Sequence, residues 1–147
     1  MGEAGGMSRS LDVGPAHARW NGETLVVLLI DAANVVGSRP TGWWRDRPGA
    51  ARVFVERVRA AVAAGRLAQP TVVVLEGTAR NGAEAGTSGG VTVVHAHGSG
   101  DDTLIAVTAD ATSHVTLVSA DRALRQRVKA LGADVASPGW LIDLLDG

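Results

Sequence analysis

The stretch "LLIDAANVVG", Leu28 to Gly37, joins an aliphatic run to a carboxylate and, three residues later, to an amide. The run begins earlier, as "TLVVLLI" over residues 24–30, and contains no alternating polar positions. Continuous aliphatic runs of this kind are typical of a strand that is buried on both faces of a parallel sheet. We therefore expect a buried strand that ends at Asp31, followed by Asn34 either as a turn residue or as an amide that orients Asp31, a phosphate or a metal-bound water.

Further aliphatic runs alternate with helical patterns along the chain. The other expected strands are "TVVVLE" (71–76), "VTVVHA" (91–96), "VTLVSA" (115–120) and the weaker "ADVA" (133–136). Helices are expected over 49–65, from about residue 101, over 121–132 and from Ser137 onward, and Leu131 is expected in the core. This alternation predicts an α/β fold with a mostly parallel sheet of four to five strands and helices on both faces.

Domain organisation is expected to be simple. Residues 1–22 lack apolar periodicity and predict a flexible leader, so the domain spans 23–147. Residues 77–90, "GTARNGAEAGTSGG", are too rich in glycine for a helix and predict a long mobile loop.

The absence of cysteine excludes disulfides, thiolate zinc sites and cysteine nucleophiles. With no signal peptide and no apolar run of about 20 residues, we expect a cytoplasmic protein.

Acidic residues stand at the carboxyl end of each strong strand. Asp31 ends the first, Glu76 the second, Asp101 and Asp102 follow the third, and Asp121 follows the fourth. Ligands of open parallel sheets bind at this edge. Clustered carboxylates repel one another unless cations neutralise them, and hard oxygen ligands suit Mg²⁺ or Mn²⁺. The sequence therefore predicts a metal site suited to phosphoester hydrolysis.

Each acid also has a simpler explanation. Asp101, Asp102 and Asp121 could complement helix N-termini, and Glu76 could be a solvated strand end. Capping is not expected for Asp31, because the helical period resumes only after Pro48, so its alternative role is in a turn.

Basic and aromatic residues suggest where a substrate would bind. Between Arg39 and Arg66, seven arginines face two acids, a net charge of +5, although the whole chain carries −1. This window predicts either a solvated helix face or a phosphate-binding surface. Trp43 and Trp44 could stack on bases while Arg45 and Arg47 hold phosphates, or the tryptophans could simply pack under the loop and against the sheet edge. Arg80, in the glycine-rich segment, is a further substrate-binding candidate.

Three motifs, in order over about residues 24–145, resemble the PIN-like nuclease superfamily and its NYN branch. "LLIDAANVVG" is similar to the first motif, "GSGDDTLIAVTAD" to the central one, and "VTLVSADRALRQRV" to the third. The resemblance implies a PIN-like α/β/α sandwich and a divalent-metal-dependent ribonuclease, with Mg²⁺ or Mn²⁺ bound by Asp31, Asp101 or Asp102, and Asp121. Asn34 and Ser119 would support these acids, and Glu76 occupies a position that varies in the family.

We thus expect hydrolysis of RNA, single-stranded in the first instance, with no membrane partner. A homodimer and an inhibitor protein are partners that the sequence leaves open. Two other functions also remain open: hydrolysis of a nucleotide or small phosphoester at the same metal site, and a non-catalytic module that binds RNA or protein.

Overall fold

The computed structural model describes residues 19–20, 23–24 and 26–147. Most of the expected leader lies outside these residues. The strands are β2 (Arg19–Trp20), β3 (Glu23–Thr24), β4 (Val26–Asp31), β5 (Thr71–Leu75), β6 (Gly86–Ser88), β7 (Val91–His95), β8 (His114–Val118) and β9 (Asp134–Ala136). The helices are α1 (Ala32–Gly37), α2 (Arg47–Ala63), α3 (Gly100–Asp110), α4 (Arg122–Ala130) and α5 (Pro138–Asp146), with the 3₁₀ turns η2 (Trp43–Arg45) and η3 (Gly77–Gly82).

The main sheet has six strands in the order β6-β7-β5-β4-β8-β9, and the short strands β2 and β3 pair separately. Every neighbouring pair of the main sheet is parallel except β6 and β7. The predicted α/β fold class is therefore confirmed. The sheet has one strand more than we expected, because β6 adds an antiparallel edge.

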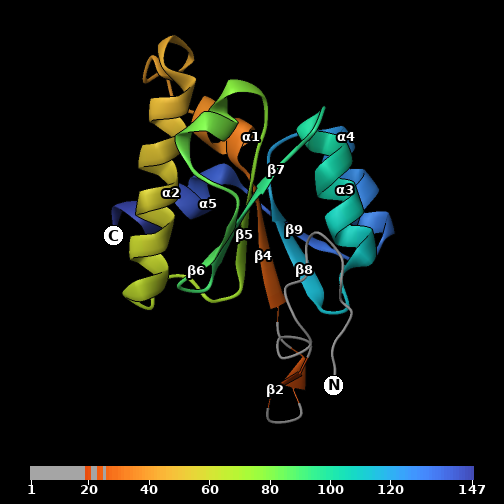
Figure 1. Ribbon diagram of the computed structural model, residues 1–147. Helices are drawn as coiled ribbons and strands as arrows, with labels where there is room; N and C mark the ends of the chain where they lie inside the picture. Colours follow the sequence, from red (N-terminus) through yellow and green to blue (C-terminus); the bar gives the residue numbers. More distant parts are fainter. Residues whose placement is uncertain (1–18, 21–22, 25) are drawn as a thin grey trace.

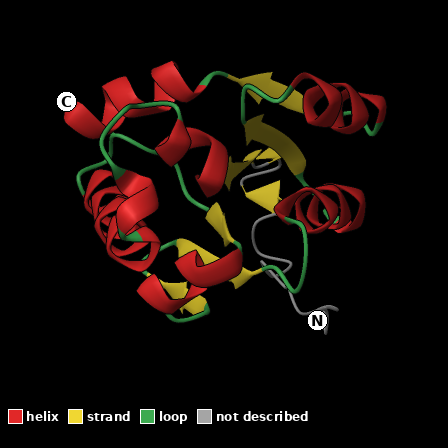
Figure 2. Ribbon diagram, turned by 90° about the horizontal axis from the view of Figure 1, so that it is seen from above, coloured by secondary structure: helices red, strands yellow, loops and turns green. Residues whose placement is uncertain are grey.

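Helices cover both faces of the sheet. α1, α2 and α5 lie on one face, and α3 and α4 lie on the other (Figure 1). Each side has its own apolar core: Phe54, Val58 and Leu141 belong to the first, and Leu104 and Leu124 to the second. Figure 2, which looks down on the carboxyl ends of the parallel strands, shows the strands between the two groups of helices. The molecule is thus a three-layer sandwich.

The helix limits follow their capping residues. Asp46 accepts a hydrogen bond from the amide of Gly49 at the start of α2, and Ser137 accepts one from the amide of Trp140 at the start of α5. These caps satisfy amide groups that the first turn of a helix leaves unpaired. Leu131, expected in the core, is instead 49% exposed, because α4 ends at Ala130 and the chain turns there.

The segment 77–90 is not the loop that its glycines predicted. Its first part forms η3 and its last part forms β6, which pairs with β7 through a turn containing Gly89 and Gly90. Both of these glycines have positive φ values, 60° and 83°. Glycine tolerates this conformation, so the composition that argues against a helix is compatible with a tight hairpin.

Gly82 lies where η3 meets the first turn of α2. A Cβ added there would lie 2.2 Å from the carbonyl oxygen of Pro48 and 2.9 Å from the amide nitrogen of Arg52. We expect Gly82→Ala to lower the free energy of unfolding by about 1–3 kcal/mol, because backbone atoms must move apart. Urea denaturation measures this change. Gly98→Ala, with nothing within 4 Å of its added Cβ, is the control, and equal effects of the two substitutions would contradict the packing.

Candidate functional site

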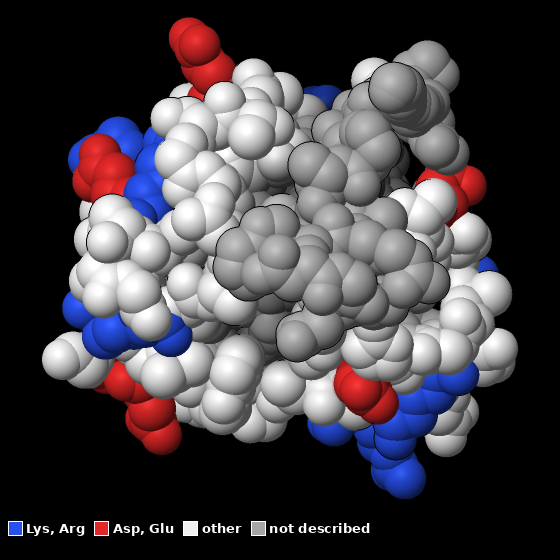
Figure 3. Space-filling view, turned by 90° about the horizontal axis from the view of Figure 1, so that it is seen from below, with Lys and Arg blue, Asp and Glu red and all other residues white. Residues whose placement is uncertain are grey.

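The site lies where the strand order reverses. From β4 the chain proceeds to β5 on one side, and after β7 it crosses to β8 on the other side of β4. Connections leave this point toward opposite faces, and in open α/β sheets this arrangement places the ligand crevice, here called the acidic crevice, at the carboxyl ends of the strands, which are β4 and β8 here. The opposite end of the molecule presents a described surface that is largely uncharged, with acidic and basic side chains near its margins (Figure 3).

Asp31 ends β4 and caps the short helix α1. Its Oδ1 accepts a hydrogen bond of 3.3 Å from the amide of Asn34. The expectation that capping could not explain Asp31 was wrong, because a helix begins at the next residue. α1 begins with two alanines, which favour helix, but its last four residues, Asn34 to Gly37, have low helix preference, so the cap and the burial of Val35 help to hold the helix in place.

Ser119 joins Asp31 to Asp121. Its hydroxyl is fully buried, donates to Oδ2 of Asp31 at 3.0 Å, and accepts from the amide of Asp121 at 3.1 Å. Asp121 in turn caps α4, since its Oδ1 accepts from the amide of Leu124 at 3.1 Å. One hydroxyl group therefore connects the ends of β4 and β8. Asp121 does have the capping role that we considered for it, and this role uses one of its two carboxylate oxygens, Oδ1.

Asn34 connects the same two segments. Its side-chain Oδ1 accepts a hydrogen bond of 2.8 Å from the amide of Ala120, in the turn between β8 and α4. The hydrogen bond from Asn34 to Asp31 comes from the backbone N–H of Asn34, whereas the side-chain amide of Asn34 is directed to Ala120. The side-chain amide of Asn34 therefore holds the turn that leads to Asp121. Hydrogen bonds made by Asn34 thus connect the first turn of α1 to the turn that precedes α4.

Glu76 follows β5 and reaches α3. Its Oε1 accepts a hydrogen bond of 3.0 Å from the amide of Gly100, the first residue of that helix. A Cβ on Gly100 would lie 2.1 Å from this oxygen, so only glycine allows the approach. Glu76 is thus more than a solvated strand end, because it fixes the position of the helix that carries Asp101 and Asp102.

Of the acidic pair, Asp101 faces the other acids. Its charge raises the pKa of Asp31, and the charge of Asp121 raises the pKa of Asp101. Asp102 is exposed on the helix surface. Adjacent helix residues diverge by about 100°, so only one of the two can point into the crevice. Ser99 is the N-cap of α3, and its hydroxyl accepts a hydrogen bond of 3.1 Å from the amide of Asp101.

Asp31 is the acid with the most strongly raised pKa. Its pKa is about 6, raised mainly by burial and also by the charges of Asp101 and Glu76, while the hydrogen bonds from Ser119 and Asn34 lower it. Desolvation raises the pKa of Asp101 as well, while Arg127 lowers it. Asp31, 7% exposed, forms no ion pair with a cationic side chain among residues 26–147. Asp31 therefore lacks a compensating positive charge in the described chain.

A small cavity of about 40 Å³ adjoins this edge. Ala32, Glu76, Trp43 and Arg47 are among its lining residues. The Arg47 guanidinium lies 4.8 Å from the ring centroid of Trp43, a distance at which a cation is attracted to the ring. Two of the proposed substrate-binding residues, Trp43 and Arg47, therefore line the same cavity as Glu76.

The other substrate-binding candidates lie elsewhere. Trp44 is 52% exposed and stacks with Arg45, whose guanidinium is 5.7 Å from its centroid, and neither residue lines that cavity. Trp43 packs beside Gly37 at the end of α1. This contact agrees with the alternative in which one of the two tryptophans has a packing role. Arg80 donates to the carbonyl oxygens of Gly77 and Ala96, which holds η3 against the end of β7.

Comparison with solved structures finds a similar backbone. The crystal structure of Rae1 (YacP) from Bacillus subtilis, a W164L mutant, superposes with a TM-score of 0.60 at 14% sequence identity, over 82% of this chain and 74% of that one. The fold is an α/β/α sandwich with a mostly parallel sheet, which is consistent with the expected PIN-like architecture. No protein-family model matches the chain, and no curated protein matches it in sequence. The comparison thus supports the fold.

The acidic residues are suitable ligands for a divalent cation, but they do not form a preorganised metal site. Among residues 26–147, no three acidic or histidine side chains lie close enough to form a metal site as they stand. Mg²⁺, however, is commonly held by one or two carboxylates, with water and substrate phosphate completing its shell. The oxygen ligands, the buried Asp31 and the missing cationic partner match that mode of binding.

Two residues at the site, Gly100 and Arg127, were not predicted from the sequence. Gly100 and Arg127 gave no motif of their own: Gly100 is one of several glycines around the acidic pair, and Arg127 is one of three arginines on α4. The approach of Glu76 to Gly100 spans 24 residues, so no local pattern records it.

Proposed function

We propose that this protein is a divalent-metal-dependent ribonuclease that hydrolyses RNA phosphodiester bonds at the acidic crevice. The observation that carries the proposal is the buried carboxylate of Asp31, which faces Asp101 and Glu76 without a cationic partner in the described chain. Structural ion pairs would neutralise such a group, whereas a cation-binding site requires it to be available.

Asp31 and Asp101 would hold Mg²⁺ or Mn²⁺, with Asp121 beside them. The ion would polarise a phosphoryl oxygen and lower the pKa of a bound water. The protein's own groups position the ligands: Ser119 fixes Oδ2 of Asp31, and Asn34 fixes the turn before Asp121. Trp43 and Arg47, which line the adjacent cavity, would contact a base and a phosphate.

The test is a cleavage assay with labelled single-stranded RNA. We expect cleavage with Mn²⁺ or Mg²⁺ and none with EDTA, because the acidic crevice needs the cation both to bind phosphate and to activate water. Asp31→Asn protein, purified in parallel, controls for a contaminating nuclease. Nucleoside triphosphates as substrates distinguish the small-phosphoester alternative, which predicts their faster turnover.

A non-catalytic RNA-binding module is the second candidate. One observation favours it: one oxygen each of Asp31, Asp121 and Glu76 is engaged by a helix amide, so these acids also have a structural use. This function predicts RNA binding that survives Asp31→Asn, with no cleavage under either metal. Binding of no divalent ion at millimolar concentration by calorimetry would contradict the ribonuclease.

A further inference from the structure

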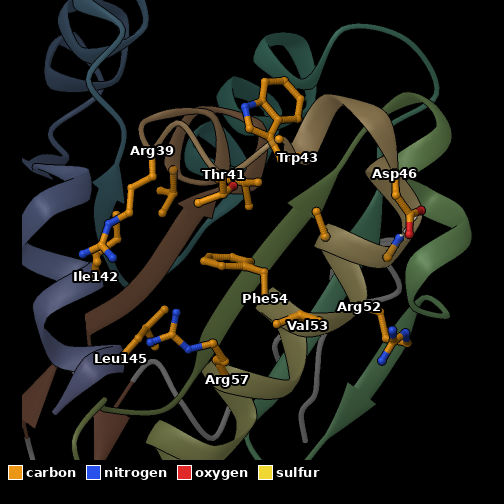
Figure 4. A pocket seen from close by; sticks show the side chains of 15 residues that line it. Arg39, Thr41, Trp43, Asp46, Arg52, Val53, Phe54, Arg57, Ile142 and Leu145 are labelled. Carbon is orange, nitrogen blue, oxygen red and sulfur yellow. Dashed lines mark hydrogen bonds between the residues drawn. The ribbon is translucent and has the colours of Figure 1, made fainter.

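A second, larger cavity lies on the other side of α1 from the acidic crevice. Its volume is about 460 Å³, and α1, α2, α5 and the segment from Arg39 to Trp43 enclose it. Phe54 points toward its centre, with Ile142 and Leu145 on the α5 side and Trp43 at one end (Figure 4). This size is within the range of small-molecule sites, and the mixture of apolar and charged walls is typical of them.

Two arginines of this cavity converge on one carboxylate. Arg39 Nη2 donates to Oδ2 of Asp146 at 3.2 Å, and Arg57 Nη2 donates to the other oxygen, Oδ1. The arginines come from the segment after α1 and from α2, whereas Asp146 is the last residue of α5. Guanidinium groups placed in this way offer several donors to an anion with two or more oxygens, which describes a phosphate.

The carboxylate of Asp146 is a replaceable occupant. All three side chains are between 40% and 47% exposed, and ion pairs of such exposure contribute little to the stability of a fold. Arg52, which also lines the cavity, lies 3.8 Å from Glu56 in a similarly exposed pair. A stronger anion could therefore displace the carboxylate without unfolding α5.

The two cavities share a wall. Trp43 lines both this cavity and the small one that contains Glu76 and Arg47. A chain with repeating bases and phosphates could thus lie along Trp43 and reach both. The positive charge of the window from Arg39 to Arg66 complements such a chain.

From these contacts we propose that the larger cavity binds a nucleotide unit of RNA, with its phosphate between Arg39 and Arg57 in place of the Asp146 carboxylate and its base against Trp43 and Phe54. The site rests on the proposed function for the identity of its ligand. It is nevertheless separate from the acids, so that binding at it requires neither a metal nor cleavage. Asp146 acts there as a competing anion within the protein.

The test measures binding of a fluorescently labelled, single-stranded RNA of eight nucleotides by anisotropy in EDTA, so that no cleavage occurs. We expect Arg57→Gln to weaken binding about 10-fold, because a charged hydrogen bond to phosphate is lost. Asp146→Asn should strengthen binding several-fold, because the competing charge is removed. Arg125→Gln on α4, which removes the same charge far from the cavity, is the matched control and should change affinity less than about 2-fold. Thermal melts check that each variant is folded.

Competition identifies the source of the ligand. Displacement of the labelled RNA by a nucleoside 5′-monophosphate at millimolar concentration, lost in Arg57→Gln, shows that a single nucleotide suffices, whereas displacement only by unlabelled oligonucleotide shows that the RNA chain is required. Either result supports the site. Displacement by an acidic peptide as effective as that by RNA overturns it in favour of a protein ligand.

The two proposals fail separately. If Arg57→Gln and Asp146→Asn both bind RNA as Arg125→Gln does, the nucleotide site is wrong, even if the protein cleaves RNA. If wild-type protein never cleaves RNA under Mn²⁺ or Mg²⁺ but binding changes as expected in the variants, the ribonuclease proposal is wrong and the nucleotide site stands.

Discussion

Asp31→Asn is expected to abolish metal-dependent RNA cleavage and to make the protein more stable. Even residues that merely support metal ligands contribute about 10- to 100-fold to activity or metal affinity, so the loss of a direct ligand should lower kcat/KM by at least about 100-fold. The neutral amide keeps the shape of the side chain and an oxygen that can accept from Asn34. Loss of activity would then reflect loss of charge and not loss of the fold.

The gain in stability follows from the raised pKa of Asp31. Because the folded protein holds the proton up to a pKa of about 6, against 3.8 for an unperturbed group, ionisation of Asp31 opposes folding. In metal-free wild-type protein, this contribution to stability is greatest below about pH 4, declines as pH rises to about 6, and stays low above that. A shift of about two units corresponds to roughly 2–3 kcal/mol, which Asp31→Asn should recover at pH 7.5.

Thermal melts in EDTA at pH 4 and pH 7.5 measure this difference. The variant should melt several degrees higher than wild type at pH 7.5 and at nearly the same temperature at pH 4. For the cleavage assay, Asp102→Asn is the matched control. It removes an exposed charge from the same helix turn as Asp101, so kcat/KM should stay within a few-fold of wild type. An Asp31→Asn protein that is less stable than wild type at pH 7.5 would show that the carboxylate is compensated.

Sequence reasoning reached the strands and the acids because both depend on local pattern. Aliphatic runs long enough for buried strands identified β4, β5, β7 and β8, and parallel strands necessarily present their carboxyl ends at one edge. The Asp31 carboxylate and the backbone amide of Asp121 lie at this edge, where both contact the Ser119 hydroxyl.

What the sequence could not show depends on contacts between distant segments. α1 is only six residues long and its last four have low helix preference, so it depends on its cap and on burial, and β6 has no apolar residue to reveal it. The amide of Asn34 meets the backbone of Ala120 across 86 residues. Arg39 and Arg57 meet Asp146 across 107 and 89 residues. Long-range pairs of this kind leave no periodic pattern, so neither the second cavity nor the choice between Asp101 and Asp102 could be predicted.

Ser119→Ala is expected to lower kcat/KM by about 10- to 100-fold while all the carboxylates remain, as is typical of residues that orient metal ligands. The buried hydroxyl is a donor to Asp31 and an acceptor for the Asp121 amide, so its removal releases one carboxylate and leaves one amide unpaired. Since the hydrogen bond from Ser119 lowers the pKa of Asp31, the variant should have a higher pKa there than wild type. Ser119 is thus a positioning residue.

Carbon-detected NMR titration of the Asp31 carboxyl group in EDTA measures that pKa directly, and a purely structural role for Ser119 would leave it unchanged. Ser137→Ala is the matched control, because its hydroxyl also accepts from a backbone amide, that of Trp140, but lies at the start of α5. Both variants should lose about 1 kcal/mol or more of stability, since each loses a hydrogen bond to an amide. Only Ser119→Ala should also lose activity and raise the pKa of Asp31. Equal activity in the two variants would mean that the hydroxyl supports the loop alone, and that Asp31 is held in place by its cap on α1.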